Sequence, residues 1–589
     1  MKPLAVVFCL FVVGLLLFLV IKAGEAEAPQ RAPAKLSTEQ DIDESVSRVN
    51  QWLRQRWSDE GLEPAGLADD LTVYRRLSLA LHGTVPSLEE ITTFMADTST
   101  DRIERWLLKM LADRRFPEYF SDRLARVLTG VEEGQFVIFR RDRLRDWLSD
   151  QLAADRPWNE TATELIAGDG LWTSQGNANF ITAAFVDKEG LDENKLAGRT
   201  VRAFLGQRID CAQCHDHPFD SWKQQDFEGL AAFYGQARVT PGGVIDRLME
   251  EKKPIEFEVI DPGEESGRVV PPRVPFHEEW ITTEGSRRQQ LASWVTHPEN
   301  RRFDRAIANR IWGLMFGRSW YDPVDDLRHP EENPEDEDLL DVLGREFHAH
   351  GSRLHFLIRL IAQSDAFRLS SEVPLADEEL YSRMSREWAV FPLVRLRPEQ
   401  MIGSMFQAGS VNTIDQNSNL FVRFGRFTNE SDFLKQYGDA ADDELLQQSG
   451  TIPQALLRMN GKFTRGLTET GPFSAAGRIM RFSGDDESLV QNCFLACLTR
   501  HPRPEERAFF VAELQQAGTA EVKVRKEALD DGTGTLLTGA DGTPADSTAT
   551  TAAGEDNQQN GTSEPRSRAE VVRDLYWVLF NSPDFSWNR

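Results

Sequence analysis

The segment from Cys211 to His215 reads C-A-Q-C-H, and it could attach a haem group covalently. Two cysteines at this spacing can each form a thioether bond to a haem vinyl group, and the histidine that follows can bind the iron. The chain has 5 cysteines and 10 histidines among 589 residues, so chance would give this pattern in roughly one such chain in a thousand. The first hypothesis is therefore a c-type haem site formed by Cys211, Cys214 and His215.

A bound zinc ion is the second hypothesis for the same segment. Thiolate and imidazole side chains are ligands that suit zinc. Neighbouring residues rarely complete a tetrahedral shell by themselves, so a distant residue would have to join them. The candidate ligands are Cys211, Cys214, His215 and His217, with Asp216 or Asp220 as a nearby carboxylate.

The third hypothesis gives the segment a purely structural role. Cys211 and Cys214 would form a disulfide or a buried thiol pair at the start of a helix, and Asp220 would cap the helix that contains Phe227 and Phe233. An exposed C-x-x-C pair can also exchange disulfides, but no thioredoxin-like βαβ pattern surrounds this one. The residue types alone leave these hypotheses open.

A second cluster of polar residues follows about a hundred positions later, with Asp322, Asp325, Asp326 and Arg328. Paired carboxylates could bind calcium or act as acid and base. We favour a capped turn that contains an arginine ion pair. The three histidines at positions 348, 350 and 355 are expected to have surface or capping roles.

Composition and missing motifs exclude several classes of function. The net charge of −27 at pH 7 would repel a phosphate backbone, so nucleic-acid binding is not expected. The chain contains no H-E-x-x-H, G-x-x-x-x-G-K-[ST], G-x-S-x-G or EF-hand pattern, so no residue supports a hydrolase assignment.

The first 35 residues are expected to direct the chain out of the cytoplasm. The run from Leu4 to Ile21 contains no charged residue, and Ala26-Glu27-Ala28 resembles a cleavage site for a signal peptide. The run is also just long enough to span a bilayer, which favours an uncleaved anchor followed by a Pro/Ala-rich tether. Both alternatives place the body in the periplasm or cell envelope, where c-type haem is normally attached.

Hydrophobic periodicity predicts a mainly α fold with two packed helical domains. Apolar residues recur at helical spacing from about 41 to 235, for example in the stripe that begins with Ile103 and Trp106. Short alternating runs between Pro and Gly residues predict a small β insertion over 237–283. Helical spacing returns from 284, and Cys493 and Cys497 lie at i,i+4 on one face as expected core residues.

The C-terminal part contains one further break in this pattern. Residues 518–567 are rich in Gly, Thr, Ala and Asp, which predicts a disordered acidic loop. A final helix from Ala569 to Phe580 carries an apolar face, and it is expected to dock on the helix Glu505–Leu514 that precedes the loop.

Several motifs resemble a known pair of domains. The first set of motifs is Leu77–Gly83, Pro86–Glu90, Cys211–Asp220, Trp222 and Gly229–Phe233. The second set is Leu291–Trp294, Asn309–Trp312, Phe316–Arg318, Asp322–Arg328, Ile452–Leu457 and Leu579–Ser582. By the first set, residues 36–236 resemble the planctomycete DUF1549 (PSCyt2) domain, and by the second, residues 284–589 resemble its partner DUF1553 (PSD1).

The resemblance implies a fold and a cellular setting more than an activity. These domains have no characterised function, and they often occur in large exported proteins with cytochrome-c-like modules, although no such extra module is visible here. His82 departs from the family, which usually has a small polar residue there, and residues 518–567 resemble an insertion.

Two functions are consistent with these observations. One is a membrane-tethered, extracytoplasmic redox protein that carries haem c and meets an unknown redox partner. The other is a non-catalytic binding or scaffolding protein of the cell envelope, whose C-x-x-C-H segment is structural or binds zinc.

Overall fold

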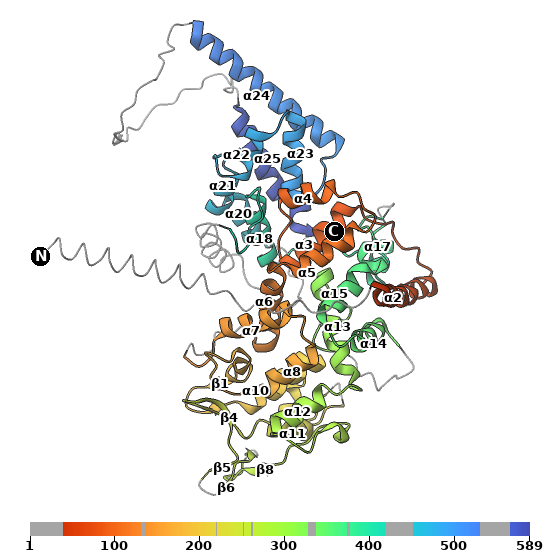
Figure 1. Ribbon diagram of the computed structural model, residues 1–589, viewed down its shortest axis with the longest axis vertical. Coiled ribbons are helices and arrows are strands. Elements are labelled where there is room, and N and C mark those ends of the chain that lie inside the picture. The colour runs from red at the N-terminus through yellow and green to blue at the C-terminus, as the bar shows by residue number, and fades with distance from the viewer. Residues whose placement is uncertain are drawn as a thin grey trace, which may run out of the picture.

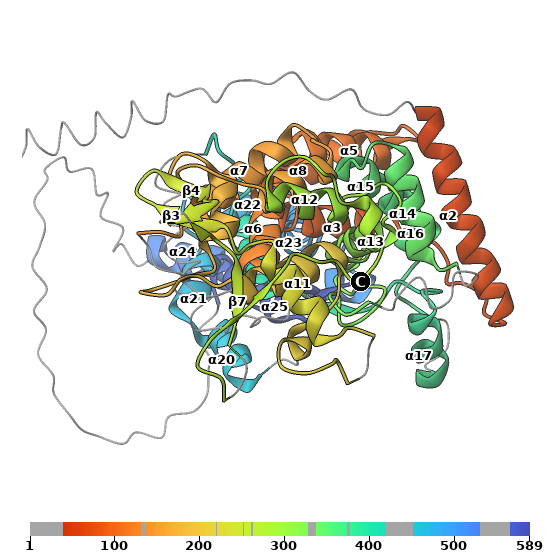
Figure 2. The same cartoon turned by 90° about the horizontal axis from the view of Figure 1, so that it is seen from below.

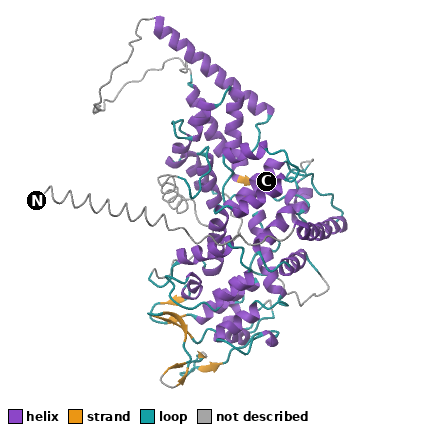
Figure 3. Cartoon of the chain, viewed as in Figure 1, coloured by secondary structure: helices purple, strands orange, loops and turns teal. Residues whose placement is uncertain are grey.

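Helices dominate the structure, so the prediction of a mainly α fold is confirmed. The computed structural model describes residues 39–130, 137–218, 221–250, 253–260, 263–327, 337–373, 377–418, 451–530 and 566–589. Within these ranges the strands form only two-stranded antiparallel pairs. Most of them gather at one end of an elongated helical body (Figures 1 and 3).

Among the first helices, α3 and α4 begin at capping residues that stand immediately before amphipathic stretches. Asp69 accepts the backbone N–H groups of Leu71 and Thr72, and Ser87 forms a capping box with Glu90. The stripe that begins with Ile103 and Trp106 is buried, as its spacing predicts. The helices are α2 (Glu39–Asp59), α3 (Asp70–His82), α4 (Leu88–Ala96), α5 (Arg102–Ala112) and α6 (Arg115–Thr129).

A second group of helices leads to the C-x-x-C-H segment. Helix α6 packs against α7, and α10 packs against α11. The helical elements are α7 (Arg141–Ala153), α8 (Trp158–Ile166), η1 (Gly176–Ala178), α9 (Asn179–Thr182), α10 (Glu193–Thr200), the π-helical η2 (Val201–Leu205), η3 (Asp210–Gln213) and α11 (Gln224–Ala232). The short strands β1 (Phe185–Val186) and β2 (Gly190–Leu191) pair with each other.

The segment that follows forms three small hairpins, in agreement with its Pro- and Gly-punctuated sequence. The strands pair in chain order, β3 with β4, β5 with β6 and β7 with β8. They are β3 (Ala237–Thr240), β4 (Gly243–Asp246), β5 (Met249–Glu250), β6 (Lys253–Pro254), β7 (Phe257–Val259) and β8 (Arg268–Val270). A 3₁₀ turn, η4 (Glu278–Trp280), precedes the return to helices.

The middle of the body is built from both halves of the chain. Helix α13 (Arg301–Phe316) is almost wholly buried, and it contacts α3, α14 and α15. Helix α2 comes first in the described chain but packs on α14, α15 and α16, as Figure 2 shows. The elements are α12 (Arg287–Val295), α14 (Leu339–Ala349), α15 (Leu354–Gln363), α16 (Asp365–Arg368) and α17 (Glu378–Arg386).

One strong polar contact joins α2 to α14. The Ser45 hydroxyl and the Arg48 guanidinium both donate to Glu346, at 2.6 Å and 2.7–2.8 Å. The pKa of the Glu346 carboxyl is lowered, because the hydrogen bonds and charge of these partners outweigh its desolvation. The two helical regions are therefore interleaved.

The remaining helices form a bundle at the end opposite the hairpins (Figure 1). Helix α25 packs on α24, as expected, and also on α20, α21, α22 and α23. The elements are α18 (Pro398–Ala408), α20 (Ile452–Asn460), α21 (Lys462–Thr468), α22 (Ala475–Phe482), α23 (Asp486–Leu498), α24 (Pro504–Asp530), α25 (Arg568–Asn581), α26 (Pro583–Ser586) and the paired strands β9 (Val394–Arg395) and β10 (Trp587–Asn588).

This bundle corrects one prediction and supports another. Helix α24 continues to Asp530, so residues 518–530 of the expected loop are helical, and residues 531–565 lie outside the described residues. Cys493 and Cys497 are both fully buried in α23, as predicted, and burial raises the pKa of each thiol.

The predicted leader and tether, residues 1–35, lie outside the described residues. In the part of the chain that the structure describes, no helix combines the length and apolar character needed to cross a bilayer.

Candidate functional site

The two cysteines of the C-x-x-C-H segment are exposed and unbonded. Cys211 lies in the short 3₁₀ turn η3 and Cys214 is the residue that ends it, where the backbone N–H of Cys214 donates to the carbonyl of Cys211 at 3.4 Å. Side chains three residues apart lie above one another in 3₁₀ geometry, so both thiols are on the same side of the turn. The predicted buried thiol pair or disulfide is therefore wrong for this structure, because the preceding Ile209 and the intervening Ala212 take the buried positions.

The imidazole of His215 is also exposed, and a hydrogen bond fixes its tautomer. Its Nδ1 lies 2.8 Å from the backbone carbonyl oxygen of Asp216. A carbonyl can only accept, so Nδ1 donates, and in the neutral imidazole the lone pair is on Nε2. Metal-binding histidines typically donate their second N–H to such a carbonyl. Two thiols that can bond haem vinyl groups and an imidazole nitrogen that can bind iron suit a c-type haem, and the same residue types, taken as ligands, are those that zinc prefers.

The residues after His215 have other partners. The Asp216 carboxylate accepts the backbone N–H of Gln224 at 3.1 Å, at the start of α11. The half-buried His217 donates its backbone N–H to the carbonyl of Trp222 at 2.8 Å. Asp220, a predicted ligand and helix cap, lies outside the described residues. No group of three or more His, Cys, Asp or Glu residues among those described is placed to hold a metal ion.

An arginine and carboxylate network connects this turn to the second half of the chain. Asp325 is 7% exposed, and Arg208 donates to it at 2.7–2.8 Å. Arg202 lies 3.6 Å from the same carboxylate and donates to Asp210 at 2.6 Å, immediately before Cys211. Asp325 is therefore in an arginine ion pair, as expected, but its partners lie in the first half, and the expected Arg328 lies outside the described residues.

Backbone contacts strengthen this connection. Leu327 donates its N–H to the carbonyl of Gly206 at 2.8 Å, and Asn309 donates to the carbonyls of Tyr321 and Val324. The Asp-rich segment therefore supports the turn that carries the cysteines.

The structure also contains an acidic site that we did not predict. Asp304 of α13 is 8% exposed, and its Oδ1 atom has no hydrogen-bond partner. Its Oδ2 lies 3.6 Å from Nδ1 of His348, and both residues line a cavity of about 590 Å³ between α13 and α14. Desolvation by burial raises the pKa of Asp304 to about 8, so the carboxyl is neutral at pH 7.

A signal for Asp304 was present in the sequence. It lies three residues before Ile307 and seven before Ile311, on the apolar stripe of a helix, where a carboxylate is unusual. The nearby histidines differ from one another: His348 is exposed, as expected, whereas His355 is buried and bonds the carbonyl of Leu152 at 3.0 Å. The expected surface position was therefore wrong for His355, but its bond to a carbonyl in the last turn of α7 is a capping contact, as predicted.

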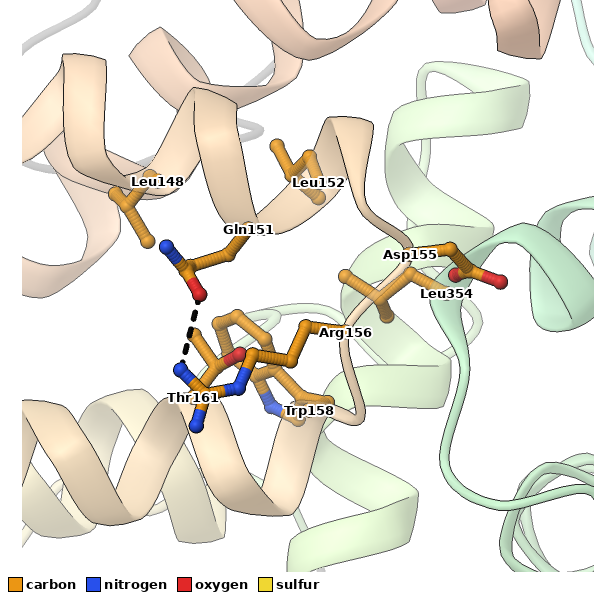
Figure 4. A pocket seen from close by; sticks show the side chains of 8 residues that line it. All are labelled: Leu148, Gln151, Leu152, Asp155, Arg156, Trp158, Thr161 and Leu354. Carbon is orange, nitrogen blue, oxygen red and sulfur yellow. Dashed lines mark hydrogen bonds between the residues drawn. The ribbon is translucent and has the colours of Figure 1, made fainter. Parts of the chain in front are cut away.

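Other cavities differ greatly in size. The cavity in Figure 4, bordered by Gln151, Arg156 and Trp158, measures about 10 Å³. This is room for about one water molecule. A cavity of about 350 Å³ lies beside Trp222 and Phe276, on the segment that leads into α11.

This mainly α architecture, with an exposed C-x-x-C-H turn supported from a second helical region, defines a two-domain helical protein. Residues 48–239 match the family described as "PSCyt2: Protein of unknown function (DUF1549)", and residues 287–514 match "PSD1: Protein of unknown function (DUF1553)". The chain therefore belongs to these families and carries the two domains in that order, as the resemblance predicted.

Comparisons with curated proteins and with solved structures gave no match. The C-x-x-C-H turn lies in the first domain, and Asp304, Asp325 and His348 lie in the second.

Proposed function

We propose that this protein is an extracytoplasmic, membrane-tethered electron carrier, with haem c attached to Cys211 and Cys214 and its iron bound by His215. One observation carries the proposal: two free, exposed thiols share one side of a 3₁₀ turn, and the next imidazole keeps an Nε2 lone pair. The uncharged run of the leader supports export and tethering.

The residues around the turn have defined roles in this proposal. The thiols are accessible for thioether formation, and the carbonyl of Asp216 orients the imidazole. Asp325 and Arg202 hold the base of the turn. A haem bound here would supply a reversible one-electron couple.

The test is export of the full chain in a host with c-type haem maturation machinery. We expect a haem absorption band that survives denaturation, and a mass increase of one haem on the intact protein. Cys211→Ser and Cys214→Ser should each lose one thioether bond, and the double variant should lose all haem. Cys493→Ala is the matched control and should keep the haem, because that thiol is buried in α23.

His215→Ala should change the absorption spectrum of any haem that stays attached, because the axial nitrogen is removed. A colourless product whose two thiols both react with an alkylating reagent would refute the haem site. Stoichiometric zinc that disappears in the same cysteine variants would replace haem by a metal site and support the binding or scaffolding alternative.

A further inference from the structure

The largest of the cavities described here lies where the two family domains meet, and it is separate from the cysteine turn. It has a volume of about 670 Å³. Its walls come from the end of α3, from α6 and α7, from the first turn of α18 and from residues 414–416. Binding sites for small molecules typically measure about 300–1,000 Å³ and are common between domains.

Two buried polar atoms in the wall have no hydrogen-bond partner. His82 is 4% exposed, and its Nε2 lies 3.2 Å from the carbonyl oxygen of Met110, which makes Nε2 the donor and leaves Nδ1 as an unpaired acceptor. Arg123 is 8% exposed, and its Nε–H is an unpaired donor. A buried polar atom without a partner is unfavourable, so a ligand that satisfies both atoms would be stabilised.

The charged groups of the wall already have partners. Desolvation lowers the pKa of His82 to about 4, which keeps the imidazole neutral at pH 7. The arginines pair with carboxylates in Arg114–Glu118 at 2.9 Å, Arg115–Glu90 at 2.5 Å, Arg123–Glu399 at 2.7 Å and Arg145–Asp146 at 3.5 Å. A charged ligand would compete with these ion pairs, whereas a neutral ligand would leave them intact.

The cavity also offers an aromatic surface. Tyr119 lines it, and the Tyr119 hydroxyl accepts a hydrogen bond from Arg397 at 2.6 Å, which fixes the ring. The ring lies against Gly83, where an added Cβ would collide with it. An apolar ring face beside many polar groups suits a molecule with both C–H faces and hydroxyl groups.

We propose that this interdomain cavity binds a neutral polyhydroxylated molecule of the carbohydrate type. Both atoms lie beneath the wall surface, so binding requires a small shift of wall side chains. After that shift, hydroxyl groups, which both donate and accept, satisfy the Nδ1 of His82 and the Nε–H of Arg123. The aromatic ring of Tyr119 covers a C–H face. This inference is independent of haem, because none of the cysteine-turn residues lines the cavity.

The test is isothermal titration of the full chain with D-glucose, maltose and myo-inositol, and with gluconate and glucosamine as charged counterparts. We expect saturable binding of at least one neutral probe and weaker binding of the charged probes. His82→Phe keeps a neutral ring but removes the acceptor, and it should weaken binding about tenfold.

A second variant tests the cavity without changing the buried His82, because His82→Phe could lose binding simply by failing to fold. Ser149→Trp projects from the partly exposed α7 wall and fills the cavity, so it should abolish binding, whereas Ser47→Trp on exposed α2 is the matched control and should bind normally. The proposal is overturned by unchanged binding in Ser149→Trp, by preference for a charged probe, or by no saturable binding of any neutral probe, which would indicate a cavity that holds water only.

Discussion

Replacing Asp304 by asparagine should stabilise the protein, and the gain should increase with pH. The carboxyl is neutral in the fold up to a pKa of about 8, whereas in the unfolded chain it ionises near 3.8. Between these two values the unfolded state binds fewer protons than the folded state. The free energy of unfolding therefore falls as the pH rises through this window, and it stops falling above about pH 8.

The magnitude follows from the width of the window. Each pH unit above 3.8 lowers the free energy of unfolding by about 1.4 kcal/mol. The loss due to Asp304 is therefore about 1.5 kcal/mol at pH 5 and about 4 kcal/mol at pH 7. These values are upper bounds for a side chain that is 12% exposed. Asparagine has nearly the same shape and no charge in either state, so Asp304→Asn should remove this penalty.

The measurement is urea unfolding of the wild type and Asp304→Asn at pH 5, 7 and 8.5, followed by far-UV circular dichroism. The difference in unfolding free energy should grow by up to about 1.4 kcal/mol per pH unit from pH 5 to 7. Asp43→Asn, at an exposed position of α2, is the control and should follow the wild type. If the free energy of unfolding changes with pH in the same way for Asp304→Asn and the wild type, the assignment of a neutral buried carboxyl is refuted.

Three further substitutions test the packing and the polar contacts. Gly83→Ala should lower the free energy of unfolding by about 1–3 kcal/mol more than Gly61→Ala does. Both glycines have φ above +60°, but only at Gly83 would the added Cβ collide with the Tyr119 ring. Equal losses in the two variants would show that backbone strain alone accounts for the effect and that the ring contact contributes nothing. Glu346→Gln should lower the free energy of unfolding by about 1–3 kcal/mol at pH 7. The loss should shrink as the pH falls through the lowered pKa of Glu346, because the protonated wild-type side chain is then neutral like glutamine. Thermal unfolding at pH 7 and pH 3 measures the difference, and an equal loss at both pH values would contradict this reasoning. Asp325→Asn should speed amide hydrogen exchange in residues 206–214 and leave residues 45–55 unchanged, and unaltered exchange in 206–214 would show that the network does not support the cysteine turn.

Elements with strong local patterns were predictable from the sequence. The stripe of α5 and the pair Cys493 and Cys497 were expected in the core, and they are buried because helical spacing places them on one face. The motif residues were sufficient to identify the two domains. Helix α24 was cut short in the prediction because residues 518–530 are poor in large apolar side chains, although helix propensity alone can continue a helix already begun.

Features that depend on distant partners were not predictable. The exposure of Cys211 follows from how Ile209 and Ala212 pack, and the neutral state of Asp304 follows from its burial against Gly344 of the next helix. The partners of Asp325 lie more than a hundred residues earlier, and no local pattern indicates them. The sequence spacing of cysteines, histidines and carboxylates indicates which residues could bind a cofactor or transfer a proton. Only the tertiary contacts show whether those side chains are protonated and whether solvent or a ligand can reach them.

The interleaving of α2 with α14 and α15 has a consequence for biosynthesis. Ser45 and Glu346 are 301 residues apart, so the apolar face of α2 leaves the ribosome long before its partners exist. At about 5–20 residues per second, the wait is roughly 15–60 s. Folding of the nascent chain therefore has to be postponed rather than completed from the N-terminus, and a chaperone that shields α2 during this interval would increase the yield of native protein.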